Sequence, residues 1–287
     1  MRKNFGMKSD LVSVNITTFN RAHLLSRCLN SVLNQSYKNI EVIIVDDAST
    51  DHTEDIVKKF QLKYDQIFYF KHKKNKGNAR ARNTALKKCN GIYVAFLDDD
   101  DEWIDENKIK KQVEIFQRNN DNKLGIVCSG IIRHTHDGFQ SKEKPNIPKN
   151  LKSRILKGGG LIHNSTVLTK KSILNELNGF NTELPRGIDY EFFIRLVVLH
   201  NYKVSIIDEL TCKYYEDSPN RMTEFGDDNV KWLKNTRYLQ IYIFKKYLKF
   251  YLMYPSSIID RLIVTLKLQL KIIIFSNLYL KKLLYKD

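Results

Sequence analysis

Cysteine is scarce in this chain: its 287 residues contain only four, and these lie far apart. A zinc site or a disulfide framework needs cysteines at short, recurring spacings, so we expect neither. We predict reduced thiols, as in a cytoplasmic protein, at Cys28, Cys89, Cys128 and Cys212. Residues 1–8 also lack the apolar stretch of a signal peptide, which agrees with that compartment.

Two nucleotide-binding motifs are missing as well. No Gly-x-Gly-x-x-Gly sequence follows the first predicted strand, and no Gly-Lys-Ser/Thr sequence of the Walker type occurs. These absences argue against a dinucleotide cofactor and against P-loop phosphate chemistry.

The hydrophobic pattern of the first hundred residues alternates between strands and helices. It predicts strands at residues 11–17, 41–45, 67–70 and 91–97, with helices at 20–33, 53–60 and 78–88 between them. This order predicts an α/β fold with a parallel, doubly wound sheet. Farther along, the pattern predicts a helix at residues 103–116 and a strand at 124–128, followed by a mobile connection at 134–160. A strand at residues 165–168 and a helix at 189–199 come after it.

Four consecutive aspartates, Asp98 to Asp101, directly follow the predicted strand at residues 91–97. Open α/β sheets bind ligands at the carboxyl ends of their strands, and four adjacent carboxylates repel one another unless a cation neutralises them. Oxygen ligands suit Mg²⁺ or Mn²⁺, which commonly bridge to substrate phosphates. The simpler alternative is a solvated acidic turn before a helix. The run therefore predicts a site for a divalent cation and a phosphate.

Polar segments recur at other predicted strand ends and at one helix start. They are Thr17–Arg21, Asp46–Asp51, Asn75–Asn83 and Gly187–Glu191. The neighbouring carboxylates of Asp46 and Asp47 can accept a hydrogen bond from an imide N–H, as uracil offers, or can cap the next helix. Taken in this order with the four aspartates, these segments closely resemble the family 2 glycosyltransferases over residues 10–215.

The resemblance implies an inverting enzyme of the GT-A fold that uses a nucleotide-diphosphate sugar. It implies a Rossmann-like, mostly parallel sheet flanked by helices in a catalytic domain at residues 1–229, followed by a C-terminal helical extension. Within that domain, we expect the nucleotide-sugar half at about residues 10–102 and the acceptor half at about 103–229.

The resemblance also implies which residues bind the donor. Thr17 and Phe19 are expected to line the nucleotide site, and Asp46 or Asp47 to accept a hydrogen bond from the base. Arg82 is expected to reach the base or the diphosphate, since arginine suits planar and phosphate groups; a surface arginine is the alternative.

The acidic motif corresponds to the Asp-x-Asp motif of the family. By resemblance, Asp98 contacts the ribose or the sugar, Asp99 belongs to the donor site, and Asp100 holds Mn²⁺ or Mg²⁺. Asp189 is the candidate general base for the acceptor hydroxyl, or alternatively the N-cap of its helix. Relatives more often have Glu-Asp at this point, whereas this chain has Ile188 before Asp189.

Outside these motifs, three side chains permit an interpretation. His163 could face the acceptor, but an ordinary loop residue is the preferred interpretation. Glu191 and Arg195 are spaced as an i,i+4 helix pair, which is a structural role.

Positive charge gathers in the C-terminal segment, residues 230–287. It contains twelve Lys or Arg against two acids, so it carries +10 of the total formal charge of +16. Its apolar run at residues 262–275 is interrupted by Lys267 and Lys271, whereas a spanning helix needs about twenty apolar residues with few charges. We predict a basic amphipathic helical tail that lies on an anionic membrane surface. A helix pair packed on the catalytic domain or in a dimer is the alternative.

The sequence therefore predicts an inverting, metal-dependent glycosyltransferase of cell-surface polysaccharide biosynthesis. The expected donor is a UDP-sugar, and the expected acceptor is a hydroxyl of a lipid-linked or growing glycan. We expect the protein to be cytoplasmic and peripheral on the inner face of the plasma membrane, without a nucleic-acid partner; a homo-oligomer is left open. The alternatives are a nucleotidyltransferase, which usually has a glycine-rich, lysine-bearing loop after its first strand, and a non-catalytic basic scaffold.

Overall fold

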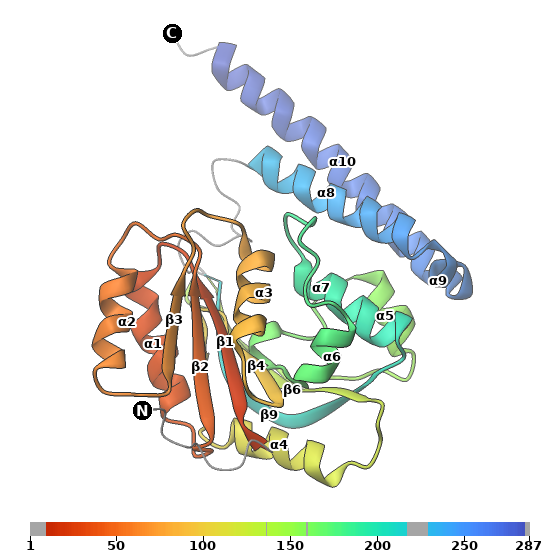
Figure 1. The fold of residues 1–287 in the computed structure, drawn as a ribbon. Coiled ribbons are helices and arrows are strands. Elements are labelled where there is room, and N and C mark those ends of the chain that lie inside the picture. The colour runs from red at the N-terminus through yellow and green to blue at the C-terminus, as the bar shows by residue number, and fades with distance from the viewer. Residues whose placement is uncertain (1–9, 136, 159, 217–228, 285–287) are drawn as a thin grey trace.

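The computed structural model describes residues 10–135, 137–158, 160–216 and 229–284. A nine-stranded sheet runs through the molecule in the order β3-β2-β1-β4-β8-β6-β9-β5, with β7 paired to β6 (Figure 1). The strands are β1 (Val12–Thr18), β2 (Ile40–Asp46), β3 (Ile67–Lys71), β4 (Tyr93–Phe96), β5 (Glu102–Trp103), β6 (Leu124–His134), β7 (Gln140–Glu143), β8 (Leu168–Lys170) and β9 (Lys203–Tyr215).

The sheet is mostly parallel. Strands β1 to β4 run in the same direction, and β6 and β9 are also parallel to each other. The short strand β8 is antiparallel to both of its neighbours, β4 and β6. The predicted α/β class with a mostly parallel sheet is therefore confirmed, and the carboxyl ends of β1, β2 and β4 lie along one edge.

Helices cover both faces of the sheet, and the two-residue period of the strands explains why. Val42 and Ile44 of β2 pack in one buried cluster, whereas Ile43 and Val45 pack in another. The first cluster includes residues of α1 (Ala22–Leu33), α2 (Thr53–Gln61) and α4 (Lys108–Arg118). The second includes residues of α3 (Asn78–Lys88), α5 (Leu151–Lys157), α6 (Lys171–Glu176), α7 (Ile188–Phe193) and the π-helix η3 (Ile194–Leu199).

The second half of the domain differs in detail from the sequence-based expectation. The helix expected at residues 103–116 begins only at Lys108, because Trp103 lies in β5 and pairs with Cys212 of β9. The connection expected to be mobile at residues 134–160 contains β7 and α5. A 3-10 turn, η2 (Asn164–Thr166), precedes β8 where a strand was expected at residues 165–168.

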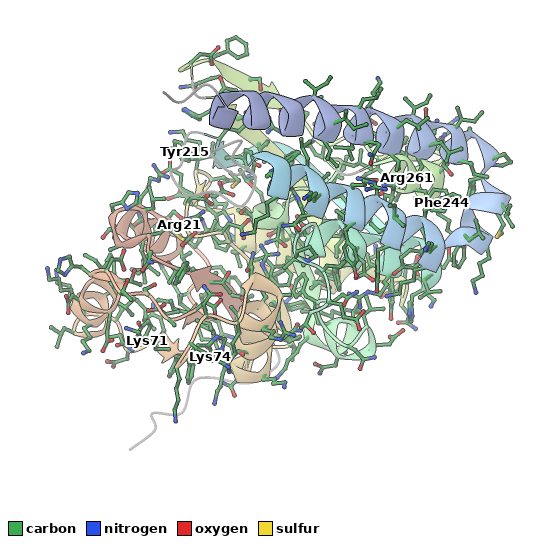
Figure 2. The ribbon with its side chains drawn as sticks, turned by 90° about the horizontal axis from the view of Figure 1, so that it is seen from above. Arg21, Lys71, Lys74, Tyr215, Phe244 and Arg261 are labelled. Carbon is green, nitrogen blue, oxygen red and sulfur yellow. The ribbon has the colours of Figure 1, made fainter. Side chains whose placement is uncertain are left out.

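Three helices follow the sheet: α8 (Asn229–Lys246), α9 (Leu248–Met253) and α10 (Pro255–Leu284). Figures 1 and 2 show α8 and α10 side by side as a long hairpin. Leu239, Ile243, Tyr247 and Tyr251 belong to the same buried cluster as residues of α7, so these helices pack on the α/β part of the chain. Within the described ranges, no helix has both the length and the apolarity needed to cross a membrane.

Candidate functional site

A cavity of about 860 Å³ opens beside the carboxyl ends of β1, β2 and β4. This volume suits a ligand of substrate size. Eight of the nine predicted site residues line it: Thr17, Phe19, Asp47, Arg82, Asp98, Asp99, Asp100 and Asp189. The ninth, Asp46, is not among its lining residues.

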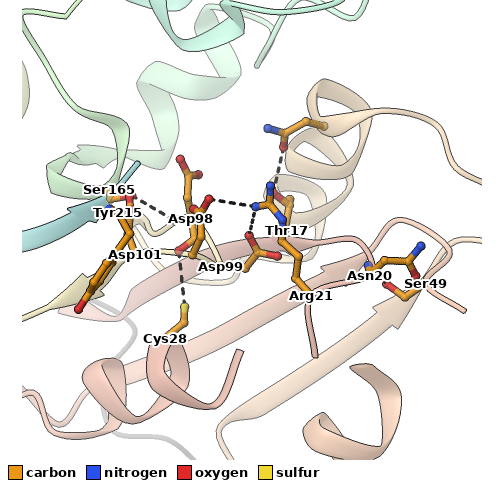
Figure 3. Close-up of polar contacts among 12 residues, drawn as sticks. Thr17, Asn20, Arg21, Cys28, Ser49, Asp98, Asp99, Asp101, Ser165 and Tyr215 are labelled. Carbon is orange, nitrogen blue, oxygen red and sulfur yellow. Dashed lines mark hydrogen bonds and ion pairs between the residues drawn. The ribbon is translucent and has the colours of Figure 1, made fainter. Parts of the chain in front are cut away.

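Two arginines form ion pairs with the aspartates of the acidic motif, and Figure 3 shows the first of them, Arg21. Arg21 Nη1 lies 2.8 Å from Asp99 Oδ1 and 3.2 Å from Asp100 Oδ2. Arg82 Nη2 donates to Asp98 Oδ1 over 2.6 Å. With a 4% exposed fraction, Arg82 is not the surface arginine of the alternative interpretation. Asp99 and Asp100 are buried and Asp98 is partly exposed, so the motif is an arginine-paired wall of the cavity and not a solvated turn.

Asp101 lines the same cavity and has hydrogen-bond partners on other elements. It is buried and accepts a hydrogen bond from the Ser165 hydroxyl over 2.6 Å. The backbone N–H of Tyr215 lies 3.4 Å from its other oxygen. Asp101 therefore ties the end of β4 to η2 and β9, which fixes the position of the three aspartates before it.

Asp99 is harder to ionise than an exposed aspartate, despite its ion pair with Arg21. Burial, with a contribution from Asp100, raises the pKa of Asp99 to about 6, even though Arg21 acts in the opposite direction. In the described part of the chain, no group of three or more His, Cys, Asp or Glu side chains is arranged to hold a metal ion by itself. The wall suits Mg²⁺ or Mn²⁺, which are often bound through one or two carboxylates together with substrate phosphates.

The two aspartates after β2 have different surroundings. Asp46 is fully buried and accepts hydrogen bonds from the Ser49 N–H (2.7 Å) and the Tyr69 hydroxyl (2.5 Å). Asp47 lines the cavity and accepts from the backbone N–H groups of Lys76 (2.9 Å) and Gly77 (2.7 Å). Asp46 thus stabilises the turn after β2 and does not cap the next helix, because α2 begins at Thr53 with His52 as its N-cap. Of the two aspartates, only Asp47 lines the cavity.

The loop before α3 depends on this contact. Gly77 precedes α3 with φ +86°, a conformation that side chains disfavour. Next to the loop, the Thr17 hydroxyl donates to Asn78 Oδ1 over 2.9 Å, and Phe19 remains 42% exposed at the cavity. An exposed aromatic ring is a surface on which a planar base can pack.

Asp189 approaches the cavity from α7. Gly187, with φ +64°, is the N-cap of this helix, so the N-cap interpretation of Asp189 is wrong. The neighbouring Glu191 is completely buried and accepts from Arg195 Nε (2.8 Å) and the Tyr247 hydroxyl (2.7 Å). The predicted Glu191–Arg195 helix pair is therefore present, and the C-terminal hairpin contacts the short helix that carries Asp189.

The structure adds two basic residues that sequence reasoning gave no role, Arg133 and Arg186, and places His163 beside them. Arg133, His163 and Arg186 all line the cavity. His163 Nε2 lies 3.5 Å from Glu143, and burial lowers the pKa of this imidazole, so it is more than an ordinary loop residue. Arg186 could have been found in the sequence, because it precedes the quoted Gly187–Glu191 segment directly.

Comparisons with known proteins give the family. A family model described as glycosyl transferase family 2 matches residues 13–177. An uncharacterized glycosyltransferase of Methanocaldococcus jannaschii is 31% identical over 248 residues, which is 85% of this chain and 81% of the relative. The UDP-Glc:alpha-D-GlcNAc-diphosphoundecaprenol beta-1,3-glucosyltransferase WfaP of Escherichia coli is 44% identical over 108 residues, 38% of this chain and 42% of that protein.

A solved structure is similar in fold. The mannosyltransferase PcManGT from Pyrobaculum calidifontis, in complex with GDP-Man and Mn²⁺, aligns with a TM-score of 0.61 at 21% identity. The alignment covers 86% of this chain and 68% of that one, which confirms the GT-A fold. The nucleotidyltransferase and scaffold alternatives gain no support from these relatives. The chain belongs to glycosyltransferase family 2.

Proposed function

We propose that the protein is an inverting, metal-dependent transferase that moves a sugar from a UDP-sugar to a hydroxyl of a lipid-linked or growing glycan in cell-surface polysaccharide biosynthesis. One observation carries the proposal: a single cavity is lined by the acidic motif, by the predicted donor residues and by Asp189. The name of the Escherichia coli relative, with its UDP-sugar donor and lipid-diphosphate acceptor, supports both substrate classes.

The donor would lie along β1, β2 and β4. Phe19 offers an exposed ring against which the uracil can pack, and Asp47 offers carboxylate oxygens to its imide N–H. Arg82 extends from α3 to Asp98, so its guanidinium lies where the diphosphate would meet the acidic wall. Asp46, which is bound to Ser49 and Tyr69, is not part of this proposal.

Asp100 is the residue that we assign to the cation, with Asp98 and Asp99 beside it. Mn²⁺ or Mg²⁺ held there would neutralise the charge that develops on the departing diphosphate. The Mn²⁺ in the Pyrobaculum complex supports a cation in this fold. Arg21 compensates Asp99 and Asp100 in the free protein and must share these carboxylates with an incoming cation.

Asp189 would act as the general base. Its carboxylate takes the proton of the acceptor hydroxyl, and the hydroxyl oxygen forms a bond to the anomeric carbon of the donor sugar. The bond from that carbon to the diphosphate oxygen breaks at the same time. Because the attack comes from the face opposite the diphosphate, the configuration at the anomeric carbon is inverted.

The C-terminal segment supports a further part of the proposal, a peripheral position on the cytoplasmic face of the plasma membrane. One side of α10 is buried at Arg261, Leu268 and Ile272. The other side exposes large apolar residues with exposed fractions of 44–63%: Ile259, Leu262, Ile263, Leu266, Leu270, Ile273 and Ile274. We retain residues 1–229 as the catalytic domain and 230–287 as its basic tail, although α8 shares the core of the domain.

Calorimetric titration with UDP, with and without Mn²⁺, tests the donor site. We expect binding that requires Mn²⁺ and is lost in Asp100→Asn, while the exposed control Asp55→Asn binds as the wild type does. GDP and dTDP are the parallel titrations, because the base is the least constrained part of the donor. A protein that binds none of the three nucleotides contradicts the proposal.

A transfer assay tests the base. Asp189→Asn should lower kcat by about 10²- to 10⁴-fold, because the proton of the acceptor hydroxyl loses its acceptor. The affinity for UDP should stay unchanged, since Asp189 belongs to the acceptor step. Normal turnover in this variant rules out Asp189 as the base.

A further inference from the structure

The basic side chains around the cavity differ in their partners. Within the described ranges, five of them line it, and four are paired with carboxylates: Arg21 with Asp99 and Asp100, Arg82 with Asp98, and Arg133 and His163 with Glu143. The fifth, Arg186, forms no ion pair with any residue that the structure describes. Among these five basic groups, Arg186 is thus the one without an ion pair to a described residue, although the Asp189 carboxylate acts on it at longer range.

The surroundings of Arg186 make the lack of an ion-pair partner energetically unfavourable. Its Nη1 atom is buried and has no hydrogen-bond partner among the described residues. Its guanidinium lies over the indole ring of Trp232, 4.1 Å from the ring centroid. Burial lowers the pKa of Arg186, yet a guanidinium stays protonated in proteins. A partly buried guanidinium whose Nη1 atom has no acceptor among the described residues is unfavourable unless a ligand supplies one.

Stacking on Trp232 explains only part of the arrangement. A ring stabilises the face of a guanidinium, whereas hydrogen bonds leave from its edge. Trp232 belongs to α8, so the C-terminal hairpin holds the guanidinium of a residue that lines the cavity. With its face held by the indole ring, the guanidinium has a restricted orientation and its N–H groups remain available to an anion.

We propose, on the basis of the function proposed above, that Arg186 binds a phosphate group of a substrate. The planar guanidinium matches the geometry of two phosphate oxygens and forms strong, charge-assisted hydrogen bonds to them. The phosphate can belong to the diphosphate of a lipid-linked acceptor or to that of the nucleotide-sugar. Since Arg186 precedes Asp189 by three residues and both line the cavity, we expect the acceptor diphosphate to be the source.

Direct binding to the full-length protein separates the two sources. The three titrants are UDP with Mn²⁺, undecyl-diphosphate-linked N-acetylglucosamine in the presence of UDP, and the neutral undecyl N-acetylglucosaminide that lacks the diphosphate. The variants are Arg186→Met, which removes the charge, and Arg186→Lys, which keeps the charge but not the planar fork. Arg118→Met is the matched control, because Arg118 is 80% exposed on α4 and pairs with Glu114 on the same helix.

We expect Arg186→Met to weaken binding of the diphosphate acceptor by about 10- to 100-fold and to leave the neutral glycoside and UDP unaffected. Arg186→Lys should recover part of the loss, which would not happen if Arg186 served only to pack against Trp232. Weaker UDP binding in Arg186→Met would assign the phosphate to the donor. If Arg186→Met does not fold, a partial loss in Arg186→Lys, restricted to one diphosphate ligand, decides between the sources.

The inference is overturned if wild type and both variants bind all three titrants equally, or if all three are weakened to the same extent. A wild-type protein that binds UDP with Mn²⁺, but whose affinities do not respond to Arg186, overturns this inference and leaves the proposed donor site intact. A wild-type protein that binds no nucleotide contradicts the proposed function itself, and this inference with it.

Discussion

Individual side chains in this protein show how a buried charge is stabilised. Asp98, Asp99 and Asp100 are acceptable in the cavity wall because Arg21 and Arg82 lie within ion-pair distance. The free-energy cost of removing two charges from water is offset only when the ion pair has good geometry and further hydrogen bonds. Such ion pairs can leave a charge that a bound ligand neutralises. Buried ion pairs of this kind are common in sites that bind ions or phosphates.

Lys108 of α4 is a buried charge of another kind. Its ammonium group donates to Gln112 Oε1 over 2.8 Å and lies 4.2 Å from the centroid of the Trp103 ring, and the side chain is completely buried. Burial lowers the pKa of Lys108 to about 7, from 10.5 in an exposed lysine. Between these two pH values, the unfolded chain binds more protons than the folded one at this position, so stability should rise with pH.

Lys108→Met tests this pH dependence. The wild type should gain up to about 1.4 kcal/mol of unfolding free energy per pH unit between pH 7 and 10.5 from this group, and the variant should lose that contribution. Urea unfolding at several pH values in this interval measures the slope. Lys110→Met is the control, since Lys110 is exposed on the same helix. Equal slopes in wild type and both variants contradict the prediction.

At the level of elements, the C-terminal hairpin and α7 depend on each other. Glu191 of α7 accepts hydrogen bonds from Lys246 Nζ (3.1 Å) and from the Tyr247 hydroxyl (2.7 Å). On the neighbouring residue, the Tyr190 hydroxyl interacts with the buried Arg261 of α10. Asp189 is therefore next to two anchored residues, and removal of α8–α10 would expose part of the main core as well as these polar groups.

Tyr247→Phe is the smallest change that tests this coupling. It removes one donor from a buried carboxylate and should lower the unfolding free energy by about 1–3 kcal/mol. We also expect a lower kcat, because the first turn of α7 loses one of its contacts to the hairpin. Denaturant unfolding and transfer assays measure the two effects. Tyr238→Phe is the matched control, since Tyr238 lies in α8 with 48% of its surface exposed, and equal losses in both variants argue against the coupling.

The strands show which secondary-structure elements a local sequence pattern can predict. Strands β1, β2 and β4 are almost wholly buried and follow one another with helices between them, so local periodicity was sufficient to locate them. The short strand β5 exists because Trp103 pairs with Cys212, which is remote in sequence. The long strand β9 likewise depends on pairing with β6, and it was not predicted. Contacts between distant segments carry no local pattern.

Prediction of the site has the same limit. The polar segments at strand ends and helix starts contain eight side chains that line the cavity, of the nine that were expected there. Sequence reasoning could not distinguish Asp46 from Asp47, because only the fold brings the Tyr69 hydroxyl to Asp46. It also gave no role to Arg133, whose partners Glu143 and Glu216 come from β7 and from the residue after β9.

For the molecule as a whole, the exposed side of α10 remains to be explained. Packing on α8 and α5 accounts for the buried side, which includes Arg261, Leu268 and Ile272. The opposite side carries a row of exposed apolar residues, including Leu266 and Leu270 at 63% and 59% exposure. Contiguous exposed apolar surface usually marks a contact with a membrane or a protein. Lys267 and Lys271 lie beside this row and are exposed, which favours an anionic lipid surface.

Vesicle flotation can test this placement. The wild type should bind phosphatidylglycerol vesicles more strongly than phosphatidylcholine vesicles, and added salt should weaken the preference. Lys267→Gln with Lys271→Gln should cost about 1 kcal/mol for each lysine, or roughly 30-fold in partitioning for the pair. Leu266→Ser with Leu270→Ser should reduce binding to both lipids, while Leu62→Ser, at an 88% exposed leucine outside α10, should not.

If the α10 variants instead convert a dimer into monomers and vesicle binding is absent in the wild type, this face joins two copies of the chain. The hydrophobic row would then stabilise an oligomer, and the acceptor would have to reach the cavity from solution.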